Sequence, residues 1–168
     1  MDADEIKALQ APLKTRYRDD PDTARLTLKR MGRLGEGVTC SVETGRAMVE
    51  AGLHPATGGT GLSACSGDML LEALVACAGV TLNAVATALG LPVTGATVCA
   101  EGDLDFRGTL GVAKDAAVGF TEIRLALDVV GELSDEQRAT LEKLTERYCV
   151  VFQTLKSPPR LSVRTSSG

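Results

Sequence analysis

Two cysteines of this sequence lie in segments with helical patterns, where their thiols could do chemistry. Cys77 lies near the centre of LLEALVACAGVTL, a largely apolar helix-forming segment at 70–82 whose one charged residue is Glu72, and Cys149 ends a second helical segment at 132–149. A cysteine attacks as a thiolate, whereas burial in apolar surroundings raises the pKa of its thiol. Because free cysteine is also among the most buried residue types, packing and redox chemistry both stay open for this pair.

The other three of the five cysteines fit structural positions. Cys40 occupies an apolar slot in an alternating segment, Cys65 lies in a loop, and Cys99 lies within a predicted strand. An odd number of cysteines without a secretory signal indicates reduced thiols in the cytoplasm. The sequence has no CxxC motif and no Cys/His cluster, so we expect no metal site.

A thiolate at Cys77 needs a positive group brought from elsewhere in the fold. The middle of a helix gains little from the helix dipole, which acts over the first turn. Arg30, Arg33 and Arg46, in the early hairpin region, are the available cations. The single histidine, His54, lies in a glycine-rich loop, where a surface or hydrogen-bonding role is the simpler interpretation. A protease-type triad is therefore disfavoured.

Composition excludes several classes of function. The 168 residues suit one domain, the net charge is −4, and aromatic residues make up only 3%. This chain therefore offers neither a basic surface nor base-stacking side chains for nucleic acid. Residues 73–91 carry no charge and are nearly long enough to cross a bilayer, but they contain Asn83 and lack flanking Lys or Arg. A buried helix of a soluble protein fits better than a membrane span.

Hydrophobic periodicity predicts the order α-β-β-β-α-β-β-α-β. We expect an N-terminal helix in 1–22 interrupted at Pro12, strands at 25–29, 38–42 and 47–52, a helix at 66–89, strands at 94–105 and 121–130, a helix from 132 to 149, and a last strand at 160–165. GRLGEG (32–37) and ETGR (43–46) are predicted turns, and 53–67 and 107–119 predicted loops.

Local signals place the helix ends. Ser66 is the expected cap of the apolar helix, with Asp68 at the positive end of its dipole. Ser134 and Gln137 form a capping box for the next helix, and Leu141, Leu144 and Tyr148 give that helix its apolar face.

Strands grouped in hairpins and helices standing apart predict an α+β fold, not a parallel α/β sheet. The sequence predicts an N-terminal helical extension, 1–22, followed by a single domain, 23–168. A helix that is apolar on nearly all sides needs more cover than one sheet of short strands. We therefore expect a homodimer with a two-fold interface.

Three segments resemble the OsmC/Ohr family of osmotically induced and organic-hydroperoxide-resistance proteins: SGDMLLEALVACAGVTL (66–82), DLDFRGTLGV (103–112) and ERYCVVFQTL (146–155). The resemblance extends from about residue 25 to 163, and ALQAPLKTRYRDDP is similar to the N-terminal extension of a bacterial OsmC-like subgroup. It implies an intertwined homodimer in which antiparallel sheets from both chains surround two central buried helices.

The resemblance also implies a reaction, the thiol-dependent reduction of hydroperoxides at the dimer interface. Cys77 would be the peroxidatic cysteine, becoming a sulfenic acid, and Cys149 would resolve it to a disulfide. A dithiol reductant would then restore both thiols, with no metal or organic cofactor required.

Peroxidase members of the family also use an arginine and a carboxylate around the first cysteine. Arg33, in MGRLGEG, matches the arginine best and Arg46 is the second choice. Many members place a glutamate nine or ten residues before the cysteine, where this chain has Asp68 and Gly67. A regular helix puts Asp68 on the face opposite Cys77, so Asp68 is either the carboxylate of the site or only a residue of the helix start.

Two other functions stay open. Val150 follows Cys149 where peroxidase members often have proline, and together with the shortened carboxylate this favours a non-catalytic dimer that binds a small apolar ligand, with packing cysteines. The other alternative is a single-thiol or sensing role, in which Cys77 oxidises and Cys149 does not resolve it.

Overall fold

The computed structural model describes residues 48–111 and 113–166 in full, the positions 2–5, 8, 11, 15 and 19, and the backbone of 32–34 and 39–43. The expected strand at 25–29 and most of the expected extension at 1–22 lie outside the described residues, as does the predicted turn after Glu43.

Helix α2, Ser66–Leu89, has the bounds that the sequence predicts. Asp68 lies in its first turn, and Gly90 ends it with a φ of 62°, a left-handed conformation that glycine adopts without strain. The expected cap is wrong, because the N-cap is Cys65 and makes no side-chain hydrogen bond. Cys65 pairs with Gly52 in a short strand, which holds its backbone extended until the helix begins at Ser66.

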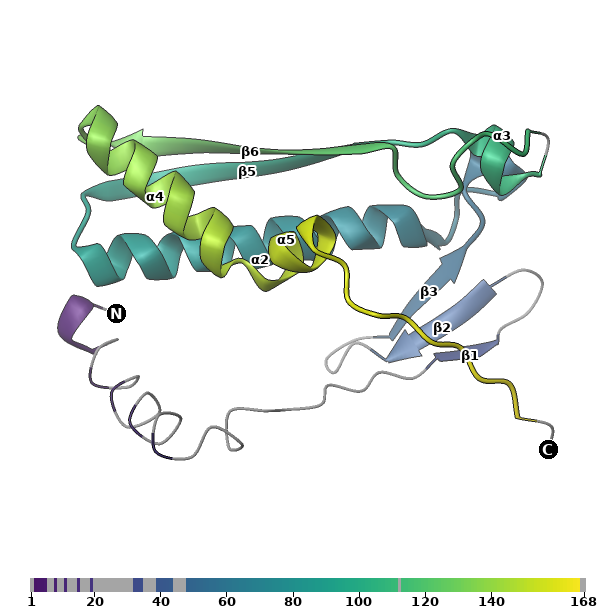
Figure 1. The fold of residues 1–168 in the computed structure, drawn as a ribbon, viewed down its shortest axis with the longest axis horizontal. Coiled ribbons are helices and arrows are strands. Elements are labelled where there is room, and N and C mark those ends of the chain that lie inside the picture. The colour runs from purple at the N-terminus through teal and green to yellow at the C-terminus, as the bar shows by residue number, and fades with distance from the viewer. Residues whose placement is uncertain are drawn as a thin grey trace.

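Strands β5, Val93–Asp103, and β6, Glu122–Gly131, form the expected antiparallel hairpin, and β5 packs against α2 (Figure 1). Four residues spaced one turn apart on α2 are buried: Leu74, Ala78, Leu82 and Ala86. The connection between the strands was expected to be a loop throughout, but it contains the short helix α3, Phe106–Thr109. Asp105 starts α3 because its side chain accepts from the Arg107 N–H at 3.0 Å.

Helix α4, Asp135–Tyr148, crosses α2 in Figure 1 and starts with the predicted capping box of Ser134 and Gln137. Its predicted apolar face is wrong at Tyr148, which is 57% exposed. The buried stripe runs instead through Leu141, Thr145 and Cys149, at the i, i+4 and i+8 spacing that faces α2. Helix α5, Val150–Lys156, follows after a break at Cys149.

The remaining strands form a separate four-stranded sheet: β1, Gly32–Leu34; β2, Thr39–Glu43; β3, Met48–Gly52; and β4, Ala64–Cys65. The pairs β1–β2 and β2–β3 are antiparallel, as the meander predicts, and β4 joins β3 in parallel. The prediction of a turn beginning at residue 32 is wrong, since Gly32–Leu34 pairs with β2 as a strand. Pro55–Thr57 forms a 3-10 turn inside the expected loop at 53–67.

The predicted last strand at 160–165 is wrong for a single chain. Residues 158–166 have no secondary structure, and Leu161 and Val163 are 84% and 93% exposed. A strand forms only against a neighbouring backbone, and none of the described strands pairs with this segment. Its alternating pattern is therefore unused within one chain.

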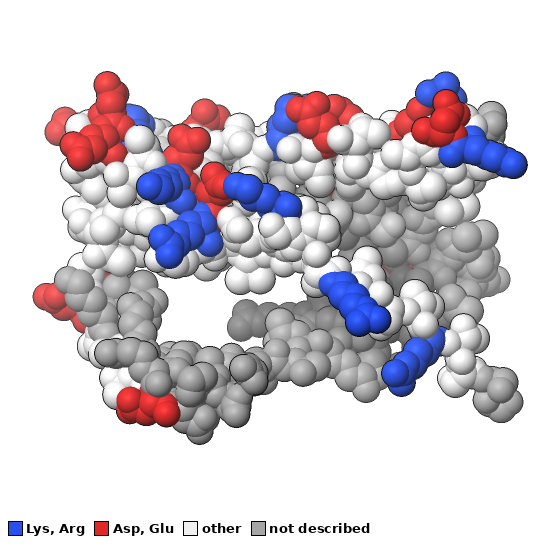
Figure 2. All heavy atoms as spheres, viewed as in Figure 1, with Lys and Arg blue, Asp and Glu red and all other residues white. Residues whose placement is uncertain are grey.

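One face of α2 is left uncovered. Ala73, Ala76 and Val80 are exposed and lie opposite the buried stripe, with Val80 at 72%. By length and composition α2 would also suit a membrane span. Its other face packs against β5, α4 and α5, as in the core helix of a folded domain. In Figure 2 many of the charged side chains gather along β6 and over α4.

Leu74 tests how much this packing stabilises the fold. It is 1% exposed and shares a core cluster with Ala78 and Cys149. We expect Leu74→Ala to lower the free energy of unfolding by about 2–5 kcal/mol, because it leaves a cavity in the core. Urea unfolding measures this, with Leu110→Ala, at a position 55% exposed, as the control that should change stability by less than about 1 kcal/mol. Equal losses for both variants would contradict this packing.

Candidate active site

The fold brings Cys77 of α2 and Cys149, at the break between α4 and α5, into contact. Their side chains are hydrogen-bonded to each other, and both belong to one core cluster with Leu74 and Ala78. Cys149 is fully buried, whereas Cys77 is only partly buried. Both are free thiols in this structure. The more accessible of the two cysteines therefore has a buried thiol directly beside it.

The surroundings of Cys77 favour its thiolate. Burial raises the pKa of its thiol, but hydrogen bonds from the Val151 N–H, the Cys149 thiol and the Val150 N–H outweigh burial, so the pKa lies below its ordinary value. The two N–H groups belong to the first turn of α5, which begins where α4 breaks. The break in the helix thus directs backbone donors at a sulfur on another helix.

Cys149 has the opposite tendency. Burial raises the pKa of its thiol, and the neighbouring Cys77 sulfur raises it further, although the Phe152 N–H donates to the Cys149 sulfur at 3.5 Å and lowers it in part. Of the two thiols, Cys77 is therefore the one that ionises first as pH rises, while Cys149 keeps its proton to higher pH. This is the asymmetry that a nucleophilic thiol and a second, initially protonated thiol require.

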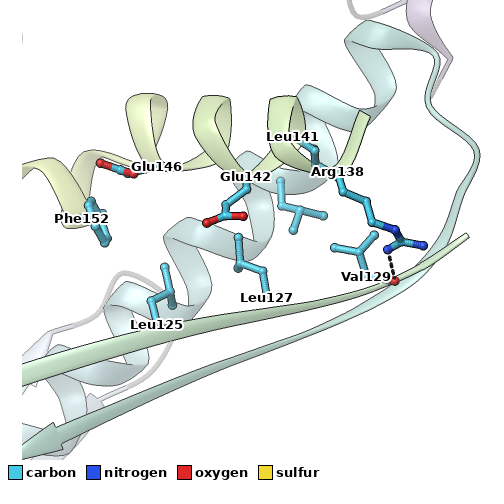
Figure 3. A pocket seen from close by; sticks show the side chains of 9 residues that line it. Leu125, Leu127, Val129, Arg138, Leu141, Glu142, Glu146 and Phe152 are labelled. Atoms are coloured by element: carbon cyan, nitrogen blue, oxygen red, sulfur yellow. Dashed lines mark hydrogen bonds between the residues drawn. The ribbon is translucent and has the colours of Figure 1, made fainter. Parts of the chain in front are cut away.

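A cavity of about 420 Å³ lies between α4 and β6 (Figure 3), and Leu125 and Phe152 of its lining also pack on the core cluster of the cysteine pair, although neither cysteine lines it. Phe152 stands at one end of it and also packs on the cluster that holds Cys149, while Arg138 stands at the other end. Arg138 donates to the carbonyls of Val129 and Gly131, both at 3.0 Å. The walls are mostly apolar, with acidic groups on α4: Leu82, Leu125, Leu127, Val129, Leu141, Glu142 and Glu146.

Of the other predicted site residues, only Asp68 has a described side chain. Arg33 lies on β1 and Arg46 outside the described residues, and nothing is described of either side chain. Asp68 lies in the first turn of α2, nine residues before Cys77, which corresponds to about 13 Å along the helix axis. This position agrees with a residue of the helix start, and the catalytic role of Asp68 stays a prediction.

The remaining candidates occupy simpler positions. His54 accepts from the Ala56 N–H through Nδ1 at 3.0 Å and stacks on Phe106 with 5.0 Å between ring centroids, in agreement with a hydrogen-bonding role. Cys99 is exposed on β5, so it is not the packed structural residue that its strand position suggested. Within the described residues, no three His, Cys, Asp or Glu side chains lie close enough to hold a metal ion.

Sequence reasoning missed the N–H groups of Val150 and Val151. Their role depends on a helix that stops at Cys149 and starts again at once, and VVFQTL carries no glycine or proline to mark the break. It also missed Thr145, because Tyr148 looked like the better apolar residue for the buried face. The i, i+4 spacing of Leu141, Thr145 and Cys149 was the available signal.

The asymmetry between the two thiols can be measured by titration. Because hydrogen bonds lower the pKa of Cys77, we expect thiolate absorbance near 240 nm to appear at lower pH in the wild-type protein than in Cys77→Ser. The thiolate fraction at Cys77 should grow as pH rises through this lowered pKa, ahead of Cys149, whose pKa is raised. Cys99→Ser, which removes an exposed thiol outside the pair, is the control and should keep the low-pH step. Loss of that step in Cys99→Ser, or its survival in Cys77→Ser, would contradict the assignment.

Comparisons with known proteins agree with this fold. Residues 59–164 match the family model of OsmC-like proteins, and no curated protein sequence matches the chain. An OsmC-like protein from Mycoplasma pneumoniae has a TM-score of 0.66 at 16% identity, over 79% of this chain and 89% of that one. An organic hydroperoxide resistance protein from Elizabethkingia anophelis has a TM-score of 0.63 at 17% identity, over 80% of this chain and 91% of that one. An organic hydroperoxide resistance protein, OsmC, from Legionella pneumophila has a TM-score of 0.62 at 14% identity, over 79% of this chain and 90% of that one.

At these identities the solved structures establish the fold alone, and the fold is the mixed α+β arrangement that the resemblance implies. The family model covers more than half of the chain and includes both Cys77 and Cys149. The chain belongs to the OsmC-like protein family.

Proposed function

We propose that this protein is a thiol-dependent peroxidase that reduces organic hydroperoxides in a reducing cytoplasm. The observation that carries the proposal is the contact between a partly exposed Cys77, whose pKa is lowered, and a buried Cys149, whose pKa is raised. Membership of the OsmC-like family and neighbours named for organic hydroperoxide resistance support a peroxide-related redox role.

The proposed reaction proceeds in two steps on the two sulfur atoms. The Cys77 thiolate attacks the terminal O–H oxygen of ROOH, the O–O bond breaks, and Cys77 becomes a sulfenic acid. The alkoxide RO⁻ leaves and takes a proton from solvent to become ROH. The Cys149 sulfur then attacks the Cys77 sulfur, the S–O bond breaks, and the oxygen leaves as water with the proton of Cys149. A dithiol reductant returns both cysteines to thiols by exchange.

The cavity beside Phe152 supports an organic substrate. An alkyl tail of the hydroperoxide gains about 0.8 kcal/mol for each buried CH₂ group, and Leu125 and Leu127 offer an apolar wall within reach of the pair. Hydrogen peroxide has no tail to bury and gains nothing there. We therefore assign the cavity to the tail, with the peroxide group toward Cys77.

A second copy of the chain is part of the proposal. The uncovered face of α2 carries Ala76 and Val80, and the segment with Leu161 and Val163 offers an unpaired strand pattern. A two-fold homodimer would cover both, and it would allow Arg33 of either subunit to reach the thiolate of Cys77. Arg33 remains the proposed arginine, with Arg46 as the second choice.

The dimer is tested at Val80. Because Val80 is 72% exposed on the uncovered face of α2, we expect Val80→Glu to convert a dimer to a monomer, since the charge would be buried without a partner. Sedimentation velocity at micromolar concentration measures the change. Val118→Glu, at a position 66% exposed outside the helices, is the matched control and should stay dimeric. A monomeric wild type would contradict the proposed dimer.

A binding module is the second candidate function, and the cavity is the observation that favours it. A cavity of about 420 Å³ with apolar walls suits a small apolar ligand without any thiol chemistry. In the described part of the chain, neither a carboxylate nor a cation contacts Cys77. A ligand retained in native mass spectrometry, without hydroperoxide turnover, would favour this candidate.

The peroxidase is tested by a map of the thiols. We expect one equivalent of cumene hydroperoxide to form the Cys77–Cys149 disulfide selectively, because these two thiols are in contact and the pKa of Cys77 is lowered. Blocking of free thiols, digestion and mass spectrometry identify the bond, and Cys77→Ser should abolish turnover. Cys99→Ser, which removes an exposed thiol outside the pair, is the control and should retain full activity. Slow oxidation spread over all five cysteines would rule the mechanism out.

A further inference from the structure

Thr145 is a buried hydroxyl without a hydrogen bond. Its residue is 0% exposed, and its Oγ1 finds no partner among the residues that the structure describes. A threonine in a helix can normally donate to the carbonyl one turn back. The helix therefore offers this hydroxyl an acceptor, and the absence of a hydrogen bond needs another explanation. Leaving such a group unpaired costs about 1–3 kcal/mol. A valine of the same shape would avoid this cost.

Thr145 lies one helical turn from the cysteine pair. Thr145 precedes Cys149 by one helical turn on the buried stripe of α4, and the Cys149 N–H donates to its carbonyl at 3.0 Å. Leu141, one turn earlier, packs with Leu82 of α2, whereas Cys149 packs with Leu74 and Ala78. Thr145 therefore faces the turn of α2 between these two contacts, which is the turn after Cys77.

The second step of the proposed reaction changes what the Cys149 sulfur needs. In the reduced protein its S–H donates to the Cys77 sulfur. Once Cys77 carries an oxygen, Cys149 has to attack as an anion while fully buried. The donors that already face it are the N–H groups of Phe152 and Val151. A buried anion with few donors is costly, so another donor would speed this step.

The direction of attack determines which sulfur can accept a hydrogen bond from Thr145. Displacement at the Cys77 sulfur places the leaving oxygen opposite the attacking sulfur. Thr145 belongs to the helix that carries Cys149, so it lies on the side of the attacking atom. With no bond to hold it, the hydroxyl can turn about χ1 toward that sulfur.

We propose that the Thr145 hydroxyl donates a hydrogen bond to the Cys149 sulfur while that sulfur, as a thiolate, attacks the sulfenic acid of Cys77. This inference rests on the proposed peroxidase function and assigns a residue to its second step. Thr145 binds no substrate and takes no part in cleavage of the O–O bond. Its hydroxyl is left unpaired in the reduced protein, at a cost in stability, and is used after oxidation.

The test separates the two steps in a single turnover with one equivalent of cumene hydroperoxide. Acid quenching, alkylation and mass spectrometry follow the loss of the Cys77 thiol and the appearance of the Cys77–Cys149 disulfide. We expect Thr145→Val to leave the first rate unchanged and to slow the second about tenfold, as for loss of a hydrogen bond to a charged group. The pH profile of the second rate should move to higher pH, and excess peroxide should yield more sulfinic Cys77.

The matched variants distinguish this role from packing. Thr145→Ser keeps the hydroxyl and should restore the second rate to within about threefold of wild type, and Thr140→Val, exposed on the same helix, should behave as wild type. Thr145→Val should also melt about 2–4 °C higher, because it removes an orphan hydroxyl. If the valine variant is insoluble, Thr145→Ala is compared with Thr145→Ser in the same way.

The outcomes also separate this inference from the function on which it rests. Two results would overturn the role of Thr145 and leave the peroxidase intact. One is a Cys77–Cys149 disulfide that forms as fast in Thr145→Val as in the wild type, and the other is a Thr145→Ser variant that forms it as slowly as Thr145→Val. A wild-type protein that forms no Cys77–Cys149 disulfide would overturn both.

Discussion

The burial of α2 is the constraint on which the rest of this structure depends. The helix carries no charge from Ala73 onward and is apolar on two opposite faces. One face is covered by β5, α4 and α5, and this cover is also what brings Cys149 to Cys77. The redox pair is thus a product of helix packing, in which the same contacts that remove apolar surface from water bring two thiols together.

The thiol chemistry arises from a competition between burial and hydrogen bonding. Burial raises the pKa of both thiols, and the outcome differs because the hydrogen bonds to Cys77 outweigh burial whereas those to Cys149 do not. The break between α4 and α5 supplies the N–H groups of Val150 and Val151 to Cys77, so a small irregularity in the backbone helps to give Cys77 the lower pKa of the two thiols. The described site reaches this asymmetry without a side-chain cation in contact with Cys77.

Local signals in the sequence were enough for the elements that carry their own end markers. The bounds of α2 and the capping box of α4 follow from short-range patterns and were predicted correctly. The face of α4 was not, because the choice between Tyr148 and Thr145 is made by α2, which no local pattern reports. The strand at 160–165 failed for a related reason, since an alternating segment cannot specify whether a neighbour exists. The positions of Cys77 and Cys149 in the sequence were enough to single them out. Their hydrogen bonds depend on how the helices pack, so only the structure shows them.

Cys149 has a double position in the backbone, and this affects how any substitution there can be interpreted. It ends α4 through its N–H, which donates to the Thr145 carbonyl, and it starts α5 through its sulfur, which accepts from the Phe152 N–H. Alanine at this position would remove the nucleophile and also the cap of α5, while serine would keep an acceptor for that helix. A difference in activity between the alanine and serine variants would therefore report on the start of α5. Only the loss of activity that both variants share would report on the thiol.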